Sequence, residues 1–222
     1  PNLLFVGTEL GTFASIDGGS NWSEFMTGMP VNPAYDMVIH PRENELVVAT
    51  HGRGIFIADI APLQGMSQEV LNADLFLFEV QDAVQYQSGL SNVTAFTNID
   101  GESRSPGTHV HFYSKSGGET TIKFYRGEKE IFNRKIEAKV GLNTFNWNFE
   151  EVTGERSQDE LDRTAERFRS FGMEEDDIAR RMEGMKYLTR TVGPGTYKVI
   201  LEKNGESESQ QVRVVQDYWS AN

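Results

Sequence analysis

Short runs of alternating apolar and polar residues recur along most of this chain, with turn residues between them. Period-two alternation is typical of β-strands that bury one face. Asp, Gly and Pro occupy the connections, as expected of antiparallel meanders. In the first 64 residues the pattern predicts six strands, at residues 3–8, 11–16, 22–26, 35–40, 46–50 and 55–59.

Two segments of this region resemble each other. LLFVGTELGTFASIDGG and LVVATHGRGIFIADIAP each contain a strand that ends in Thr, a turn with Gly, and a second strand that ends in Asp. A repeat of about 40 residues built from strands alone is typical of propeller blades. We therefore predict that residues 1–63 are the last strands of a β-propeller, amounting to fewer than two blades.

Residues 64–73 are predicted to be a short helical linker, after which the strand pattern resumes. Strands are predicted at residues 75–79, 83–87, 109–114, 120–126, 130–136, 143–149, 195–203 and 207–215. A series of short strands with clean alternation is typical of an immunoglobulin-like sandwich. We assign residues 74–217 to such a domain, so the predicted fold class is mainly β.

A charged segment interrupts these strands. Residues 151–192 show no strand alternation and carry 11 acidic and 8 basic residues. Ser157 and Glu160 have the spacing of a helix-capping box. Two helical faces follow, Leu161, Ala165, Phe168 and Phe171 on the first and Ile178, Met182, Met185 and Leu188 on the second. An αα-hairpin is therefore predicted within residues 155–190, either as a solvated surface insertion or, through Met173, Met182 and Met185, as a protein-docking element.

Composition narrows the classes of function. The chain carries 33 acidic and 21 basic residues, a formal net charge of −12, which argues against nucleic acid and anionic membranes as partners. The absence of cysteine excludes disulfides, thiolate nucleophiles and cysteine-ligated zinc. No apolar run approaches the ~20 residues of a membrane span. Because the chain starts at Pro1 without a signal-peptide pattern, we expect it to be a piece of a longer protein.

Residues 15–22, SIDGGSNW, match the pattern S-x-D-x-G-x-x-W at Ser15, Asp17, Gly19 and Trp22. This motif resembles the Asp-box of bacterial-neuraminidase-type repeats. With its surroundings, VGTELGTFASIDGGSNWSEF and HPRENELVVATHGRGIFIADIAPL, the region is similar to the last blades of sortilin-like ten-bladed propellers. Such propellers occur in large exported bacterial proteins that are often described as glycosyl hydrolases.

The second half carries a further resemblance. GLNTFNWNF and GPGTYKVILEKNGE look like strands of the flagellar-hook-cap type of immunoglobulin module. The helical insertion departs from that pattern, so the resemblance implies no function for it.

Asp17 is a candidate catalytic carboxylate or calcium ligand. The alternative is that its carboxylate accepts hydrogen bonds from the amides of its own turn, while Trp22 covers the hairpin. The resemblance implies the second role, because the Asp-box lies at the periphery of a blade. The spacing also lacks the alternating oxygens and terminal Glu of a helix-loop-helix calcium site.

Other candidates are weaker. His51 and Arg53, in THGRGI, form a candidate ligand-binding pair, in which His51 is a general base and Arg53 binds an anion. The alternative is that Gly52 and Gly54 only form a turn, which accounts for half of this motif. His109 and His111 share a strand face and suit zinc only with a third ligand. Glu150 and Glu151 diverge as strand neighbours and make a poor acid/base pair.

A sugar-binding interpretation has two sources. The long polar loop at residues 88–107 is typical of binding loops. The aromatic residues of the second half could stack on sugars, although alternation predicts that half of them, including Trp147, lie in the core; they are Phe112, Tyr113, Phe124, Tyr125, Trp147 and Tyr197.

The expected function is that of a non-catalytic accessory module in an exported sortilin-like propeller protein, at the cell surface, in the periplasm or outside the cell. The alternative is part of a glycoside hydrolase of sialidase or xyloglucanase type, or its carbohydrate-binding module. Expected partners are the upstream blades, carbohydrate or protein, and a second copy through exposed propeller edges. We expect no catalytic residue in this chain, no metal and no cofactor.

Overall fold

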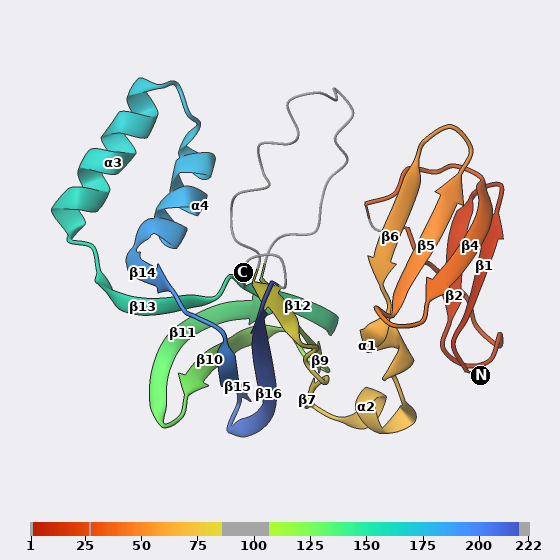
Figure 1. Cartoon of the computed structure of the whole chain (residues 1–222). Helices are drawn as coiled ribbons and strands as arrows, with labels where there is room; N and C mark the ends of the chain where they lie inside the picture. The colour runs from red at the N-terminus through yellow and green to blue at the C-terminus, as the bar shows by residue number, and fades with distance from the viewer. Residues whose placement is uncertain (1, 27, 86–106, 218–222) are drawn as a thin grey trace. The chain divides into compact units, whose positions relative to one another are not determined.

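The computed structural model describes residues 2–26, 28–85 and 107–217 of the chain. The structure is mainly β, which confirms the predicted fold class at that level (Figure 1). The chain divides into two compact units, Pro1–Ala73 and Asp74–Asn222. Each unit is described by itself.

The first unit contains two three-stranded antiparallel meanders, and strands lie at all six predicted positions. The first sheet has the order β1-β2-β3 and the second β4-β5-β6. Their bounds are Leu4–Thr8 (β1), Gly11–Ser15 (β2), Ser23–Glu24 (β3), Ala34–His40 (β4), Glu45–Thr50 (β5) and Ile55–Asp59 (β6).

A small core lies in this unit. Leu46, Val48 and Ile60 are fully buried, and Phe5 and Phe56 are among the partly buried side chains around them. Two short helices follow β6, α1 at Ala61–Gln64 and α2 at Gln68–Asn72. The Ser67 hydroxyl caps α2 by accepting the Val70 N–H at 3.2 Å.

The second unit is built on three sheets. Five strands have the order β11-β10-β15-β16-β8, three have the order β12-β9-β7, and β13 pairs with β14. All pairings are antiparallel except that of β8 with β16, which is parallel. The bounds are Leu75–Leu77 (β7), Ala83–Gln85 (β8), Thr108–Ser114 (β9), Gly118–Arg126 (β10), Lys129–Ala138 (β11), Gly141–Trp147 (β12), Glu150–Glu155 (β13), Tyr187–Thr191 (β14), Gly195–Lys203 (β15) and Glu206–Gln216 (β16).

One hydrophobic core joins the five-stranded and three-stranded sheets. Trp147 is completely buried at its centre, stacked on Phe124 at 4.1 Å between ring centroids and edge-on to Tyr197 at 5.2 Å. Its indole N–H donates to the Glu150 carbonyl at 2.9 Å, so its polar atom is satisfied. Trp147 is thus a core residue, as alternation predicted, and cannot offer its ring to a sugar.

The prediction that residues 151–192 lack strands is wrong. β13 and β14 pair across this segment, with a bulge between Val152 and Gly154. Apolar and polar residues do not alternate clearly along either strand, because the ribbon is exposed over much of its length and contributes few side chains to the core. Its stability comes from cross-strand pairing, which no local pattern in the sequence reveals.

Two helices continue this ribbon, α3 at Gln158–Ser170 and α4 at Glu175–Met185 (Figure 1). The predicted capping box is present: Ser157 accepts the Glu160 N–H, and the Glu160 carboxylate accepts the Ser157 N–H. The predicted apolar face of the first helix does not extend to Phe171, because this residue is 76% exposed. Ile178 is the only fully buried residue of α3 and α4, and the side chains of Met173, Met182 and Met185 are half-buried.

Candidate functional site

The turn at SIDGGSNW is held by its own side chains. The Ser15 hydroxyl donates to Asp17 Oδ1 at 2.8 Å and accepts the Gly19 N–H at 2.9 Å. Asp17 Oδ1 also accepts the Asn21 N–H at 2.9 Å, and Oδ2 accepts Asn21 Nδ2 at 2.7 Å. The Trp22 indole donates to the Gly19 carbonyl at 3.1 Å. The bond from the Asn21 N–H to Asp17 is the kind of contact that the turn interpretation predicts.

These bonds also determine what Asp17 can do. The side chain and then the backbone of Asn21, followed by Ser15, lower the pKa of Asp17 to about 2. A carboxylate that already accepts three hydrogen bonds and stays ionised is a poor general acid. Asn21 supplies two of the donors although it stands at a variable position of the motif, so the motif did not point to it.

His51 and Arg53 lie in the exposed loop between β5 and β6. The backbone of His51 donates to Pro33 at 3.1 Å and accepts from Asn32 Nδ2 at 2.9 Å. The His51 ring lies 5.0 Å from the ring of Tyr35. The structure thus accounts for the shape of the loop, and a ligand-binding role for the pair stays a prediction.

The two histidines of β9 lie side by side. Their ring centroids are 6.4 Å apart with nearly parallel planes, and His111 Nδ1 lies 2.9 Å from the Thr144 hydroxyl. Within residues 2–26, 28–85 and 107–217, no group of three or more His, Cys, Asp or Glu is arranged to hold a metal ion. Over the same residues, no helix is long and apolar enough to cross a membrane. The candidate loop at residues 88–107 lies, except for Gly107, outside the described residues.

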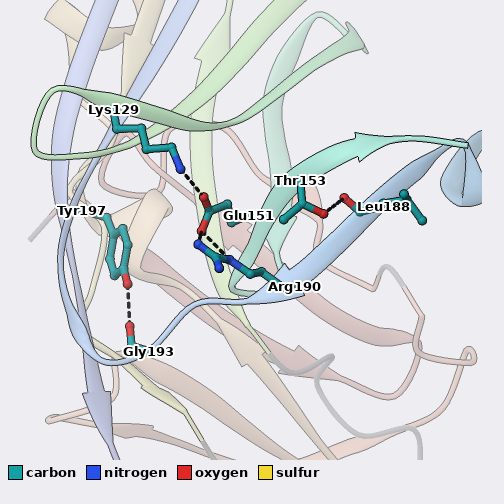
Figure 2. Close-up of polar contacts among 7 residues, drawn as sticks. All are labelled: Lys129, Glu151, Thr153, Leu188, Arg190, Gly193 and Tyr197. Carbon is teal, nitrogen blue, oxygen red and sulfur yellow. Dashed lines mark hydrogen bonds and ion pairs between the residues drawn. The ribbon is translucent and has the colours of Figure 1, made fainter.

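Glu151 forms the centre of a charged network that joins three strands (Figure 2). Its side chain comes from β13, and Oε1 lies 2.6 Å from Nζ of Lys129 on β11. Its other oxygen accepts hydrogen bonds from Nε and Nη2 of Arg190, on β14, at 2.9 and 2.7 Å. Glu151 is 7% exposed, and hydrogen bonds from Lys129 and then Arg190 lower the pKa of its carboxyl. This arrangement fixes the ribbon to the sheet and keeps Glu151 ionised, so it is poorly suited to proton transfer.

A groove of about 1000 Å³ lies between β11, the β12–β13 region and α4. Arg134 is one of its lining residues. The guanidinium lies 3.4 Å from the centroid of the Tyr187 ring and 4.9 Å from that of Phe132, and burial lowers the pKa of Arg134. The sequence did not reveal this groove, because two of its walls are the unpredicted strands β13 and β14. Its lining residues are Glu130, Ile131, Phe132, Asn133, Arg134, Lys135, Ile136, Phe145, Asn146, Asn148, Glu150, Val152, Glu155, Arg180, Glu183, Gly184, Lys186 and Tyr187.

The sheet β4-β5-β6 has an apolar row on each face. On one face, Met37, Val48 and Phe56 are aligned in register and belong to the core of the first unit. On the opposite face, Val38 and Ile57 flank Val47 in register. Val38 is 61% and Ile57 63% exposed, and neighbouring Ile55 is 69% exposed. Adjacent exposed apolar side chains of this kind are typical of a surface that packs against another protein layer.

Comparison with known proteins gives no further constraint. No family model, no curated protein and no solved structure matches this chain.

Proposed function

We propose that this chain is a non-catalytic accessory module of an exported, sortilin-like Asp-box propeller protein. Its first unit contributes propeller strands that pack against further β-sheets, and its second unit is an immunoglobulin-like sandwich that carries the helical hairpin. The observation that carries this proposal is the sheet β4-β5-β6, which has an apolar row on each face. A sheet in a two-layer arrangement needs only one such face.

The first unit itself illustrates how such a face is covered. Phe5, from β1, belongs to the cluster around Leu46 and Val48 of β5. Gly7 of β1 comes so close to β4 that an added Cβ would lie 3.0 Å from the Ala34 side chain. One sheet therefore covers one face of β4-β5-β6, and we propose that a second sheet of the same kind covers the row with Val38 and Ile57. In the intact protein the upstream blades would supply it, and for the isolated chain a second copy would.

The Asp-box geometry supports the proposed ancestry. Ser15, Asp17, Gly19 and Trp22 all take part in the hydrogen bonds of one turn. In the family that the motif resembles, this turn stabilises a hairpin of the blade and does not act on a substrate.

Two features of the second unit support the immunoglobulin-like assignment. Tyr197, near the start of β15, donates its hydroxyl hydrogen to the Gly193 carbonyl four residues upstream, at 2.5 Å (Figure 2). This contact has the form of the tyrosine corner found in immunoglobulin-like sandwiches. The parallel pairing of β8 with β16 also joins the amino-terminal part of the unit to its last strand, although all other strand pairs are antiparallel.

The non-catalytic part of the proposal rests on the carboxylates. Asp17 and Glu151 are both ionised and engaged by hydrogen bonds to neighbouring groups. A glycoside hydrolase needs one carboxyl group that is protonated to act as general acid. Both of these carboxyl groups have lowered pKa values, opposite to that requirement.

Three assays on the purified chain test the assignment. We expect no turnover of chromogenic glycosides, no retardation on polysaccharide affinity gels, and self-association that depends on protein concentration. Glycoside turnover that His51→Ala or Asp17→Ala removes without unfolding the chain would identify an enzyme and contradict the proposal. Retardation on the gels would favour a sugar-binding module.

A further inference from the structure

The groove beneath α4 is bordered by a strand edge. β11 ends the five-stranded sheet, and within the described parts of the chain its register partners all belong to β10. Seven consecutive residues of β11, from Glu130 to Ile136, line the groove. Because alternate side chains of a strand point to opposite faces, an unbroken run lines one groove only where the backbone edge faces it. At the Lys129 end, β13 packs against β11 through Glu151. Beyond that contact, main-chain N–H and C=O groups of β11 border the groove, and such an edge is a template for another strand.

The inner wall of the groove is apolar. Ile136, Phe145 and Val152 line it, and all three are partly buried side chains that pack against the main core. A strand added to β11 would place every second side chain against this wall. Main-chain hydrogen bonds together with contacts for alternate side chains are the two components of peptide recognition by strand addition.

A glycine lies where α4 borders the groove. Gly184 is the penultimate residue of α4 and lines the groove. A Cβ at this position would meet no atom within 4 Å. The groove is therefore open next to Gly184, and a main chain from outside could approach α4 there.

The charges of the groove argue against a polyanionic partner. Four basic and four acidic residues line it. This balance offers no net attraction to a polyanion such as nucleic acid, and it does not repel a peptide of low net charge. The basic set is Arg134, Lys135, Arg180 and Lys186, and the acidic set is Glu130, Glu150, Glu155 and Glu183.

We propose that this groove binds an extended peptide segment of a partner protein, which adds as a strand to the outer edge of β11 beneath α4. The segment has alternating apolar and polar residues, with the apolar ones against Ile136, Phe145 and Val152. This inference uses the second unit alone and is independent of the function proposed for the first unit.

The test is selection of a displayed library of random linear peptides, about ten residues long as in a strand, against the full chain. We expect enriched peptides with alternating apolar residues. Their binding should slow amide hydrogen exchange in Lys129–Ala138. N-methylation at alternate positions should weaken binding by about tenfold or more in one register and little in the other, since only one set of amides faces β11.

Substitutions in α4 provide the matched control. Gly184→Phe places a ring in the groove and should abolish binding of the selected peptides. Ala179→Phe adds the same ring at an exposed position of α4 outside the groove lining and should leave binding unchanged. Gly184→Ala should keep both fold and binding, and circular dichroism verifies that each variant is folded.

Several results would overturn the proposal. They are failure to enrich any peptide, binding that is insensitive to both N-methylation and Gly184→Phe, or exchange protection confined to other strands. Occupation of the groove by an oligosaccharide from a glycan array, without peptide binding, would equally overturn it.

Discussion

The carboxylate of Glu151 accepts two hydrogen bonds from the guanidinium of Arg190, and these two residues are register partners on β13 and β14. The same carboxylate is bonded to Lys129 on β11, so one side chain connects the ribbon beneath the helical hairpin to the main sheet (Figure 2). The position of α4 above the groove thus depends on an acidic residue that the sequence suggested only as half of a poor catalytic pair.

Replacement of Glu151 by Gln should destabilise the second unit. The amide keeps the shape but loses the charge, and hydrogen bonds to charged groups contribute about 1.5–3 kcal/mol. We therefore expect a loss of about 1–3 kcal/mol in the free energy of unfolding, measured by urea denaturation. Glu119→Gln is the control, because its ion pair with Lys135 is exposed on both sides and should change stability by less than ~1 kcal/mol. Equal effects of the two substitutions would contradict the structural role of Glu151.

Tyr197→Phe should destabilise the same unit through the loss of one buried bond. The hydroxyl donates to Gly193, and the ring is only 1% exposed. Removal of the hydroxyl leaves the carbonyl without this donor, at a cost of about 1–2 kcal/mol in the free energy of unfolding. Tyr125→Phe is the control, since that hydroxyl bonds the exposed side chain of Glu130. A thermal melt that shifts no more for Tyr197→Phe than for Tyr125→Phe would contradict the proposed tyrosine-corner role.

Asp17 should make the first unit sensitive to acid. Its pKa is about 2 in the folded chain and 3.8 ordinarily, so its contribution to stability is fully present above about pH 4 and is lost as the pH falls toward 2. Asp17→Ala should lower stability at neutral pH and flatten the fall between pH 4 and 2, followed by unfolding at fixed urea. Glu9→Ala, which removes an exposed acid, controls for the loss of one negative charge. A profile for Asp17→Ala that is parallel to the wild type would show that the turn does not depend on the carboxylate.

Prediction from the sequence succeeded where the signal was local. Alternation located β6 and β15, and the spacing of Ser157 and Glu160 located the start of α3, because each depends on residues near in sequence. The strands β13 and β14 were missed because they are separated by two helices and are stabilised by pairing with each other. Asp17 was correctly expected to bond to its own turn.

The groove could not be predicted for the same reason. Arg134 and Tyr187 are far apart in the sequence and meet only because β13, β14 and α4 fold back over β11. The apolar row with Val38 was not predicted either, although the sequence carries a local signal for it. The unbroken apolar runs at residues 37–39, 46–48 and 55–57 are typical of strands with an apolar row on each face.

The central claim is that the exposed apolar face of β4-β5-β6 packs against another β-sheet, and multi-angle light scattering of the purified chain over a range of concentrations tests it most directly. We expect the wild-type mass to rise above that of the 25.0 kDa monomer with concentration. The double variant Val38→Lys/Ile57→Lys should stay monomeric, because two charges oppose burial of the face. Val140→Lys, at a residue 69% exposed in the second unit, should behave as the wild type. A wild-type chain that remains monomeric at every concentration, or a double variant that associates equally, would contradict the claim.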